Sequence, residues 1–358
     1  MYKIGLDLGY GYVKGINEEG KTVIFPSLVG NAYDRNLKGL FGADFDKRLD
    51  NMHLVLTGET KEEFFVGELA RRESRNVSYA FDEDKINHPN TAALLAASCL
   101  LLFPEKGIPV HLVTGLPLEQ YIHKKDEFKD MLLNFKKIAG FKDCDEVKII
   151  KFDKVTIFPQ AAGAVYYAIL DELKRFMING SYIGLIDIGF KTTDYIVFMI
   201  DGKLILREDM SGTVNVGMSH IHQTIDRIFT QKTGAKLDIP ELIRLVRNGS
   251  IFFRGEEINM SKELSHISKE ISKVIKDRLK AVWGSKLDFF HTVFFAGGGS
   301  KELFPYLADI HPNSTIVDSA QFANAKGFLR VATTAEKSRD EYPQGMEIVL
   351  NCLHLRKI

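Results

Sequence analysis

The chain has 358 residues, of which 45% are hydrophobic and 26% charged, so it is long enough for two folded domains with cores of their own. Its 47 basic residues balance its 47 acidic residues, so no net field attracts nucleic acid, and any link to DNA would pass through an adaptor protein. The three cysteines are scattered and odd in number, which argues against a disulfide framework or a zinc site.

The first half of the chain begins with a strand pattern that breaks into an acidic loop containing glycine. Strand formers at 2–6 are followed at 7–14 by DLGYGYVK and at 17–20 by a hairpin signal, so residues 1–27 predict three strands. Gly9 and Gly11 would let backbone N–H groups approach phosphate oxygens closely, and Lys14 could place a positive charge on them.

The middle of the first half predicts an insertion followed by helices. Residues 28–86 suggest strands and loops, with a strand and turn at 64–68. The predicted elements that follow are a helix from Thr91 to about Phe103 with a cap at 87–90, a helix within 119–139, a strand over 147–157, and a helix over 164–176 that leads to a second domain.

The second half of the chain repeats the opening pattern. Strand formers at 182–186 lead into DIGFKTTD at 187–194, and a turn at 201–202 again predicts three strands, here over 182–207. Asp7 and Asp187 cannot bind phosphate directly, because like charges repel, but both suit a Mg²⁺ ion that keeps several of its waters. Thr192 and Thr193 add hydroxyl donors. Two such loops predict two related domains that clamp a polyphosphate between them.

The remaining elements continue this second domain. A helix is expected to open at 215–219 and to run to about Thr230, and the apolar spacing over 261–282 predicts a helix with one face in the core. His220 and His222 are interpreted as helix-surface residues. A strand at 291–296 then breaks into three glycines, which suit a flat ring or ribose lying against bare backbone, and Ser300 is expected to cap the next helix.

These motifs together resemble the actin-like ATPase superfamily. Residues 7–14 resemble the first phosphate motif of that superfamily, and residues 187–194 resemble the second. Residues 158–164 and 321–328 resemble its two connectors, and residues 294–300 resemble its adenosine motif. The five motifs occur in the family's order and span nearly the whole chain. The connector PQA, the loop IDIGxxTTD and the ending QFANAxG are most similar to bacterial ParM-type plasmid-segregation actins and small archaeal actin relatives. Residues 110–118 also resemble a strand and turn of those proteins.

The resemblance implies an α/β, actin-like fold: two related domains with mixed sheets flanked by helices around a nucleotide cleft. Domain I would comprise 1–161 and 324–358, with the small insertion at about 28–86, and domain II would comprise 162–323. The cofactors implied are ATP or ADP and Mg²⁺; a preference for ATP over GTP is left open.

Two positions depart from the family pattern. The second phosphate loop has Phe190 where glycine is usual, and its neighbour Lys191 either compensates with charge or points to solvent. The connector has Gln160, as in actins, where many ParM-type proteins have glutamate. Glutamine cannot act as a general base at neutral pH, so its expected role is to place the attacking water.

The expected site follows from these motifs. The catalytic residues are Gln160, Asp187 and Asp7, and the last two would hold the metal through water. The expected nucleotide-binding residues are Gly9, Gly11, Tyr12, Lys14, Gly189, Lys191, Thr192, Gly297, Gly298, Gly299 and Ser300.

The leading functional hypothesis is a polymerising ATPase whose partner is itself in a head-to-tail filament, with a DNA-binding adaptor for plasmid segregation. One alternative is a membrane-tethered, division-type scaffold, which needs a terminal amphipathic helix; residues 345–358 fit a weak helix or a last strand equally well. A sugar or metabolite kinase of the same fold needs a catalytic carboxylate in the first domain, and no clear candidate exists. A cytoplasmic protein without membrane contact is expected, because the apolar run 92–103 is too short to span a bilayer and Lys3 interrupts the apolar start.

Overall fold

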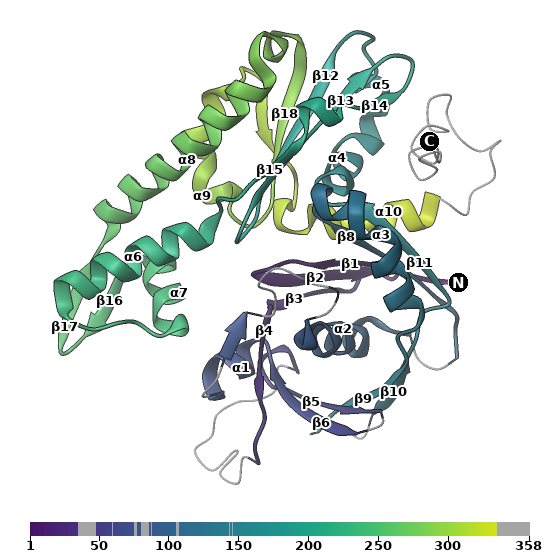
Figure 1. Cartoon of the computed structure of the whole chain (residues 1–358), viewed down its shortest axis with the longest axis vertical. Coiled ribbons are helices and arrows are strands. Elements are labelled where there is room, and N and C mark those ends of the chain that lie inside the picture. The colour runs from purple at the N-terminus through teal and green to yellow at the C-terminus, as the bar shows by residue number, and fades with distance from the viewer. Residues whose placement is uncertain are drawn as a thin grey trace. The chain divides into compact units, whose positions relative to one another are not determined.

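The computed structural model describes residues 1–34, 48–58, 60–74, 77–79, 86, 88–104, 107–142, 144 and 146–334. The chain divides into two compact units (Figure 1). Unit 1 contains Met1–Leu116, Gln120–Phe158 and Phe328–Thr333, and unit 2 contains Pro117–Glu119 and Pro159–Gly327. The domain boundaries expected from the sequence remain a prediction. Asn87, Cys352 and the segment 345–358 lie outside the described residues.

The first sheet of unit 1 is mixed and carries the first acidic loop. Its strand order is β11-β8-β1-β2-β3, with β1 antiparallel to β2 and parallel to β8. These strands are β1 (Tyr2–Leu8), β2 (Tyr12–Asn17), β3 (Thr22–Pro26), β8 (Val110–Leu116) and β11 (Lys154–Pro159). The three strands expected in residues 1–27 are confirmed.

The second sheet of unit 1 is antiparallel and has the order β10-β9-β5-β6-β4-β7. The insertion supplies four of its strands, and β9 and β10 come from much later in the chain. The strands are β4 (Leu28–Asn31), β5 (Met52–Thr57), β6 (Lys61–Val66), β7 (Val77–Tyr79), β9 (Lys137–Phe141) and β10 (Val147–Ile150).

Helix α2 (Pro89–Leu102) contacts strands of both sheets of unit 1. Its uniformly apolar sequence from Ala92 onward explains this position, because a helix that is hydrophobic all round is buried all round. The other helical segments of unit 1 are η1 (Arg48–Asp50) and α1 (Glu68–Glu73), and α3 (Leu118–Leu133) begins at the boundary between the units.

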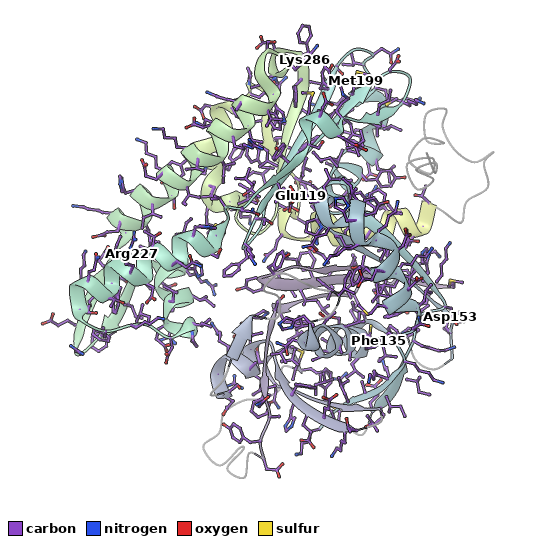
Figure 2. The ribbon with its side chains drawn as sticks, viewed as in Figure 1. Glu119, Phe135, Asp153, Met199, Arg227 and Lys286 are labelled. Atoms are coloured by element: carbon purple, nitrogen blue, oxygen red, sulfur yellow. The ribbon has the colours of Figure 1, made fainter. Side chains whose placement is uncertain are left out.

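Two expected elements of unit 1 are wrong in detail. The strand predicted over 147–157 is two strands, because the chain is interrupted at Asp153, which is labelled in Figure 2. The Val110 N–H donates to the Asp153 carboxylate at 2.9 Å, and the Asp153 N–H donates to the Val110 carbonyl at 3.0 Å. The turn predicted at Glu68 is the start of α1, which follows Gly67 at φ +65°.

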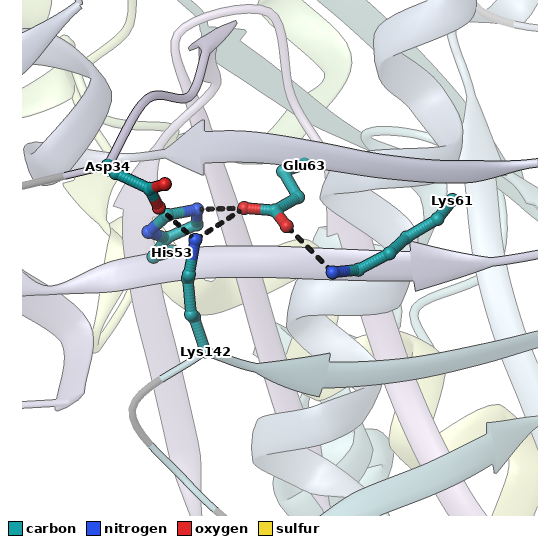
Figure 3. Close-up of polar contacts among 5 residues, drawn as sticks. All are labelled: Asp34, His53, Lys61, Glu63 and Lys142. Atoms are coloured by element: carbon teal, nitrogen blue, oxygen red, sulfur yellow. Dashed lines mark hydrogen bonds and ion pairs between the residues drawn. The ribbon is translucent and has the colours of Figure 1, made fainter.

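A network of charged residues lies on the second sheet of unit 1 (Figure 3). The Glu63 carboxylate accepts hydrogen bonds from Lys61 at 2.9 Å and from Lys142 at 3.0 Å, and it lies 3.0 Å from His53 Nε2. Lys142 also pairs with Asp34 at 2.5 Å. Hydrogen bonds from the two lysines hold the pKa of Glu63 down at about 2.

The main sheet of unit 2 repeats the first sheet of unit 1. Its order is β14-β13-β12-β18-β19, with β12 antiparallel to β13, parallel to β18, and with β15 pairing β13. The strands are β12 (Tyr182–Ile188), β13 (Thr193–Ile200), β14 (Leu204–Leu206), β15 (Gly212–Val214), β18 (Phe290–Ala296) and β19 (Ser314–Ile316). The α/β class is therefore confirmed, with a mixed sheet in each unit.

Helices pack against this sheet, and a small hairpin extends the unit. The α-helices are α4 (Ala162–Ile169), α5 (Leu173–Phe176), α6 (Met218–Thr233), α7 (Ile239–Asn248), α8 (Ser261–Trp283), α9 (Ser300–Leu307) and α10 (Ala323–Thr334), of which Phe328–Thr333 belongs to unit 1. The hairpin is β16 (Ser250–Phe253) with β17 (Glu256–Asn259), and 3-10 turns lie at η2 (Leu170–Glu172), η3 (Glu208–Met210), η4 (Gly284–Phe289), η5 (Ala308–Ile310) and η6 (Ala320–Phe322). The predicted helix over 261–282 is confirmed.

Three expectations in unit 2 need correction. The helix predicted over 164–176 is interrupted by the 3-10 turn η2, after which the Phe176 ring packs at an edge against Phe294. Ser300 is the first residue of α9, not its cap; the cap is Gly299, because the Ser300 hydroxyl donates instead to the Gly297 carbonyl at 2.8 Å. His222 is half-buried on α6 rather than on the surface, as described below.

Candidate nucleotide site

The two acidic loops have the same geometry in the two units. In unit 1, β1 and β2 pair Asp7 with Lys14 and Leu8 with Val13. In unit 2, β12 and β13 pair Asp187 with Asp194 and Ile188 with Thr193. The two hairpins therefore turn at matching positions after the aspartate, and the repeat inferred from the sequence is present in the structure.

The loop of unit 1 leaves room only for glycine at its first turn position. A Cβ at Gly9 would lie 2.7 Å from the Tyr12 carbonyl oxygen and 3.2 Å from Lys14 Nζ. Ser27 fixes the carbonyls of the loop, because its hydroxyl donates to Gly9 O at 2.6 Å and its N–H donates to Gly11 O at 2.9 Å. Sequence reasoning missed Ser27, since a serine after a strand carries no signal of its own.

The charged pair of this loop is largely buried. Lys14 Nζ lies 3.3 Å from Asp7 Oδ2, and the two side chains are 13% and 6% exposed. The pair keeps each charge compensated away from water, because an isolated buried charge is costly. Tyr10, between the two glycines, accepts a hydrogen bond from Gln120 Nε2 at 3.1 Å, which ties the loop to α3.

The loop of unit 2 is held by the start of α6. The carbonyls of Gly189 and Phe190 accept from the N–H groups of Met218 at 3.2 Å and Ser219 at 2.7 Å. Gly217 is required at this contact, since a Cβ there would lie 2.7 Å from Phe190 O. The first N–H groups of a helix have no partner within the helix, so here they fix the shape of the loop.

Phe190 replaces the usual glycine and packs against α6. Its ring meets the His222 ring edge to face, with 5.4 Å between the centroids. Burial lowers the pKa of His222 to about 4, so this imidazole is neutral at physiological pH. His220 is not an ordinary surface residue either, because its Nδ1 accepts from the Gly217 N–H at 3.3 Å.

The threonines of this loop serve the protein itself. Thr193 donates its hydroxyl proton to Val216 O at 2.8 Å, so it is not the phosphate donor that the sequence suggested. The Thr192 hydroxyl makes a long bond of 3.4 Å to Asp194, whose other oxygen accepts from Thr213 at 2.5 Å. Lys191 lies beside Thr192 at the turn and is partly exposed.

Asp187 is joined to both connectors within unit 2. Asn324 Nδ2 donates to Asp187 Oδ2 at 2.7 Å, and Asn324 Oδ1 accepts from the Ala161 N–H at 3.0 Å. Ala161 has φ +66°, which is unusual for a residue with a side chain, and it directly follows Gln160. Gln160 is 7% exposed and Asp187 is 8% exposed.

The three glycines after β18 lie against the end of β12, next to Asp187 and Ile188. Gly297 has φ +89°, and a Cβ there would lie 2.4 Å from both Asp187 Oδ1 and Ile188 O. The Gly299 N–H donates to Ile188 O at 3.0 Å. Gly298 differs, because its Cβ would meet nothing closer than Gln321 Nε2 at 3.8 Å. A side chain at Gly298 would therefore meet little of the protein, and a flat ligand lying against this backbone stays a prediction.

The structure thus brings the expected residues together in two groups. In unit 2 these are Gln160, Asp187, Gly189, Lys191, Thr192, Gly297, Gly298, Gly299 and Ser300, and in unit 1 they are Asp7, Gly9, Gly11, Tyr12 and Lys14. That both groups bind one ligand is a prediction.

The donors fit a hydrated cation better than a directly bound one. Within the described ranges, no three histidine, cysteine, aspartate or glutamate side chains gather closely enough to hold a metal ion. Asp7 and Asp187 are buried carboxylates whose polar neighbours include Lys14 and Asn324, respectively. A Mg²⁺ ion that keeps its waters needs only one or two carboxylates.

The fold and these loops define an actin-like protein. Residues 5–163 match the family described as actin like proteins, N terminal domain, and residues 185–309 match the archaeal actin homologue MreB-like, C-terminal. The chain belongs to the actin-like proteins of the ParM type, and the two-domain actin-like fold expected from the sequence is confirmed.

The relatives support this placement. The chain is 39% identical to the ParM protein of a 15-stranded filament from Clostridium botulinum, covering 93% of this chain and 99% of that one with a TM-score of 0.87. It is 38% identical to a non-polymerisable quadruple mutant of pCBH ParM, with the same coverage and a TM-score of 0.85. An archaeal actin homolog of Thermoplasma acidophilum is 23% identical over 343 residues, covering 93% of this chain and 99% of that one. An archaeal actin homolog solved in complex with ADP shares the fold at 21% identity and a TM-score of 0.74, covering 93% of this chain and all of that one.

No helix in the described part of the chain is long and apolar enough to cross a membrane.

Proposed function

We propose that this protein is an ATPase that binds ATP with Mg²⁺, polymerises head to tail with copies of itself, and hydrolyses ATP to control disassembly. Segregation of plasmid DNA through a DNA-binding adaptor is the cellular role that fits best. The observation that carries the proposal is the pair of matching acidic hairpins, one at the centre of each mixed sheet. The 39% identity to a ParM protein that forms filaments supports the assembly.

The phosphate-binding role falls to the two hairpins. The loop glycines Gly9, Gly11 and Gly189 present backbone to the phosphates, and Lys14 supplies positive charge. Asp7 and Asp187 would hold the water shell of a Mg²⁺ ion. When bound, Mg²⁺ neutralises charge on the phosphates, which makes the terminal phosphorus easier to attack.

The attacking water is assigned to Gln160. Its amide can accept a hydrogen bond from the water and donate another, which orients the water without removing a proton. The strained residue after it, Ala161, is held by Asn324, so the position of Gln160 is fixed by the backbone as well as by packing. Gly297, Gly298 and Gly299 are assigned to the nucleoside.

Assembly follows from the effect of the nucleotide on the protein. ATP bound by both units would favour one arrangement of the units over others, which is a population shift. A single head-to-tail contact that does not close on itself generates an open filament. Hydrolysis would then weaken the contact and permit disassembly.

Phosphate release and sedimentation measured on the same protein test the proposal. With ATP and Mg²⁺ the protein should sediment at micromolar concentration and release phosphate. If the protein stays in the supernatant at every concentration and phosphorylates a small metabolite, it is a metabolite kinase and not a polymerising ATPase.

A further inference from the structure

Helix α8 carries a seven-residue repeat that the proposed nucleotide site does not use. Residues 261–267, 268–274 and 275–281 read SKELSHI, SKEISKV and IKDRLKA. The second position is lysine in all three copies, and the third is acidic in all three. Along its apolar side α8 contacts α6 and α9 (Figure 1), and its buried residues include Ile267, Ile275 and Leu279.

The charged positions form two parallel rows on the outer side of the helix. At 3.6 residues per turn, the lysines fall within about 60° of one another around the axis, and at a rise of 1.5 Å per residue they extend over about 27 Å. These lysines are Lys262, Lys269, Lys273, Lys276 and Lys280. The acidic row lies about 80° away around the same axis and consists of Glu263, Glu270 and Asp277.

Most members of the two rows face solvent. Lys262, Lys269, Lys273, Lys280, Glu270 and Asp277 are all exposed. The remaining side chains are partly used within unit 2. Lys276 reaches Asp309 at 2.5 Å, and Glu263 pairs with Lys232 of α6.

Two neighbouring rows of opposite charge are self-complementary in one relative direction. When a second α8 lies beside the first and points the same way, the acidic row of one copy is next to the lysine row of the other. The common period of seven residues then aligns all the charge pairs at once. An antiparallel neighbour would place like rows together, which is unfavourable.

We propose that the charged face of α8 is the lateral contact through which parallel strands of this protein associate. The inference rests on the proposed filament. The partner at this face is a second copy of the chain, because a face with one lysine row and one acidic row is complementary to an identical face. A uniformly charged partner fits less well, since a polyanion such as DNA would meet the acidic row beside the lysines. In this arrangement both rows of both copies are used, so the contact joins two parallel strands as a closed, two-fold pair. The related ParM protein from Clostridium botulinum assembles into a 15-stranded filament, so lateral association of strands occurs in a relative of this chain.

Charge reversal with a charge-swap rescue tests the contact. In the double variant Lys269→Glu/Lys273→Glu, both rows are acidic at their centre and neighbouring strands should repel there, leaving single protofilaments in electron micrographs taken with ATP and Mg²⁺. Adding Glu270→Lys and Asp277→Lys to the same chain exchanges the charges at the centre of the two rows and returns the net charge to that of wild type. This fourfold variant should regain multi-stranded filaments.

The matched control is Lys129→Glu/Lys174→Glu, which makes the same change in net charge at exposed positions of α3 and α5. It should keep the wild-type number of strands. Wild-type strands should also separate as salt is raised, since exposed charges interact over only about 8 Å at 0.15 M ionic strength.

Three results would overturn the inference while leaving the proposed function in place. They are an unchanged strand number in the double reversal, a folded fourfold variant that stays single-stranded, and duplex DNA binding by wild type that the reversal abolishes without changing the strands. Filaments absent from wild-type protein under all nucleotide conditions would instead overturn the proposed function, and the lateral contact with it.

Discussion

Asn324 joins Asp187 to the residue that follows Gln160. Its Nδ2 donates to Asp187 Oδ2 at 2.7 Å, and its Oδ1 accepts from the Ala161 N–H at 3.0 Å. One buried amide therefore orients the carboxylate assigned to the metal and the backbone beside the glutamine assigned to the water. We infer that Asn324 is a positioning residue of the proposed ATPase site.

Replacing Asn324 should impair hydrolysis more than folding. Asn324→Ala is expected to lower ATP turnover by about 10- to 100-fold, the range typical of residues that orient metal ligands, and to raise the Mg²⁺ concentration needed for half-maximal rate. Asn17→Ala is the matched control, because Asn17 is also buried and bonds Tyr2 and Leu102 in unit 1. A variant of Asn324 with unchanged Mg²⁺ dependence and turnover would remove this role.

Removal of the Asp187 carboxylate should abolish most ATPase activity while the fold is retained. The expectation follows from its place in the duplicated hairpin and from the need for a carboxylate near the hydrated cation. Circular dichroism checks the fold and phosphate release checks the activity. Asp209→Ala, at an exposed ion pair with Arg207 in the same unit, serves as the control. Wild-type turnover in Asp187→Ala would refute the metal assignment.

Gln160→Ala should separate binding from hydrolysis. We expect ATP affinity close to that of wild type and hydrolysis slower by about 100-fold, since positioning a reactant contributes on that order. Because disassembly is proposed to follow hydrolysis, its filaments should also persist longer. If binding and hydrolysis fell together, Gln160 would have a structural role instead.

The three consecutive glycines should respond differently to an added methyl group. Gly297→Ala should lose nucleotide binding and stability, because φ is +89° and the new Cβ would lie 2.4 Å from Asp187 Oδ1. Gly298→Ala should leave stability nearly unchanged, since its nearest atom would be 3.8 Å away, but it should weaken nucleotide binding if the ring lies on this backbone. Thermal unfolding and titration with ATP measure both effects. Equal loss of stability in the two variants would contradict the packing described.

The network around Glu63 predicts a pH dependence of stability. The folded pKa of Glu63 is about 2, below its ordinary value of 4.5, so its contribution is complete above pH 4.5 and is lost as pH falls toward 2. The lysines are partly exposed, so we expect a contribution of about 1 kcal/mol. Urea unfolding of wild type and Glu63→Gln should differ by that amount at pH 7 and should converge by about pH 2. A difference that grows with acidity would show that the network does not hold the ionised carboxylate.

The sequence was informative where chemistry is local. The spacing from Asp7 to Lys14 and from Asp187 to Asp194 contains the strand, the turn glycine and the acidic residue, so the hairpins could be predicted. The antiparallel sheet of unit 1 could not, because β5 pairs with β9 from more than seventy residues further along the chain and no local pattern records that partner.

The polar partners of the site were also beyond sequence reasoning. In the sequence Asn324 is visible only as part of the motif at 321–328, and its bonds to Asp187 and Ala161 depend on how α10 and the connector pack. Thr193 was expected to face a ligand, yet its hydroxyl bonds to Val216 because β13 alternates its side chains between two faces. The residue types indicate which chemistry is possible, whereas the direction in which each side chain points depends on the tertiary structure.

The most direct test of the central claim is electron microscopy of the purified protein with ATP and Mg²⁺, with ADP and Mg²⁺, and without nucleotide. If ATP controls assembly, filaments should form with ATP and Mg²⁺, fewer or shorter ones with ADP, and none without nucleotide. Filaments of equal length and number in all three samples, or none in any of them, would contradict assembly controlled by ATP.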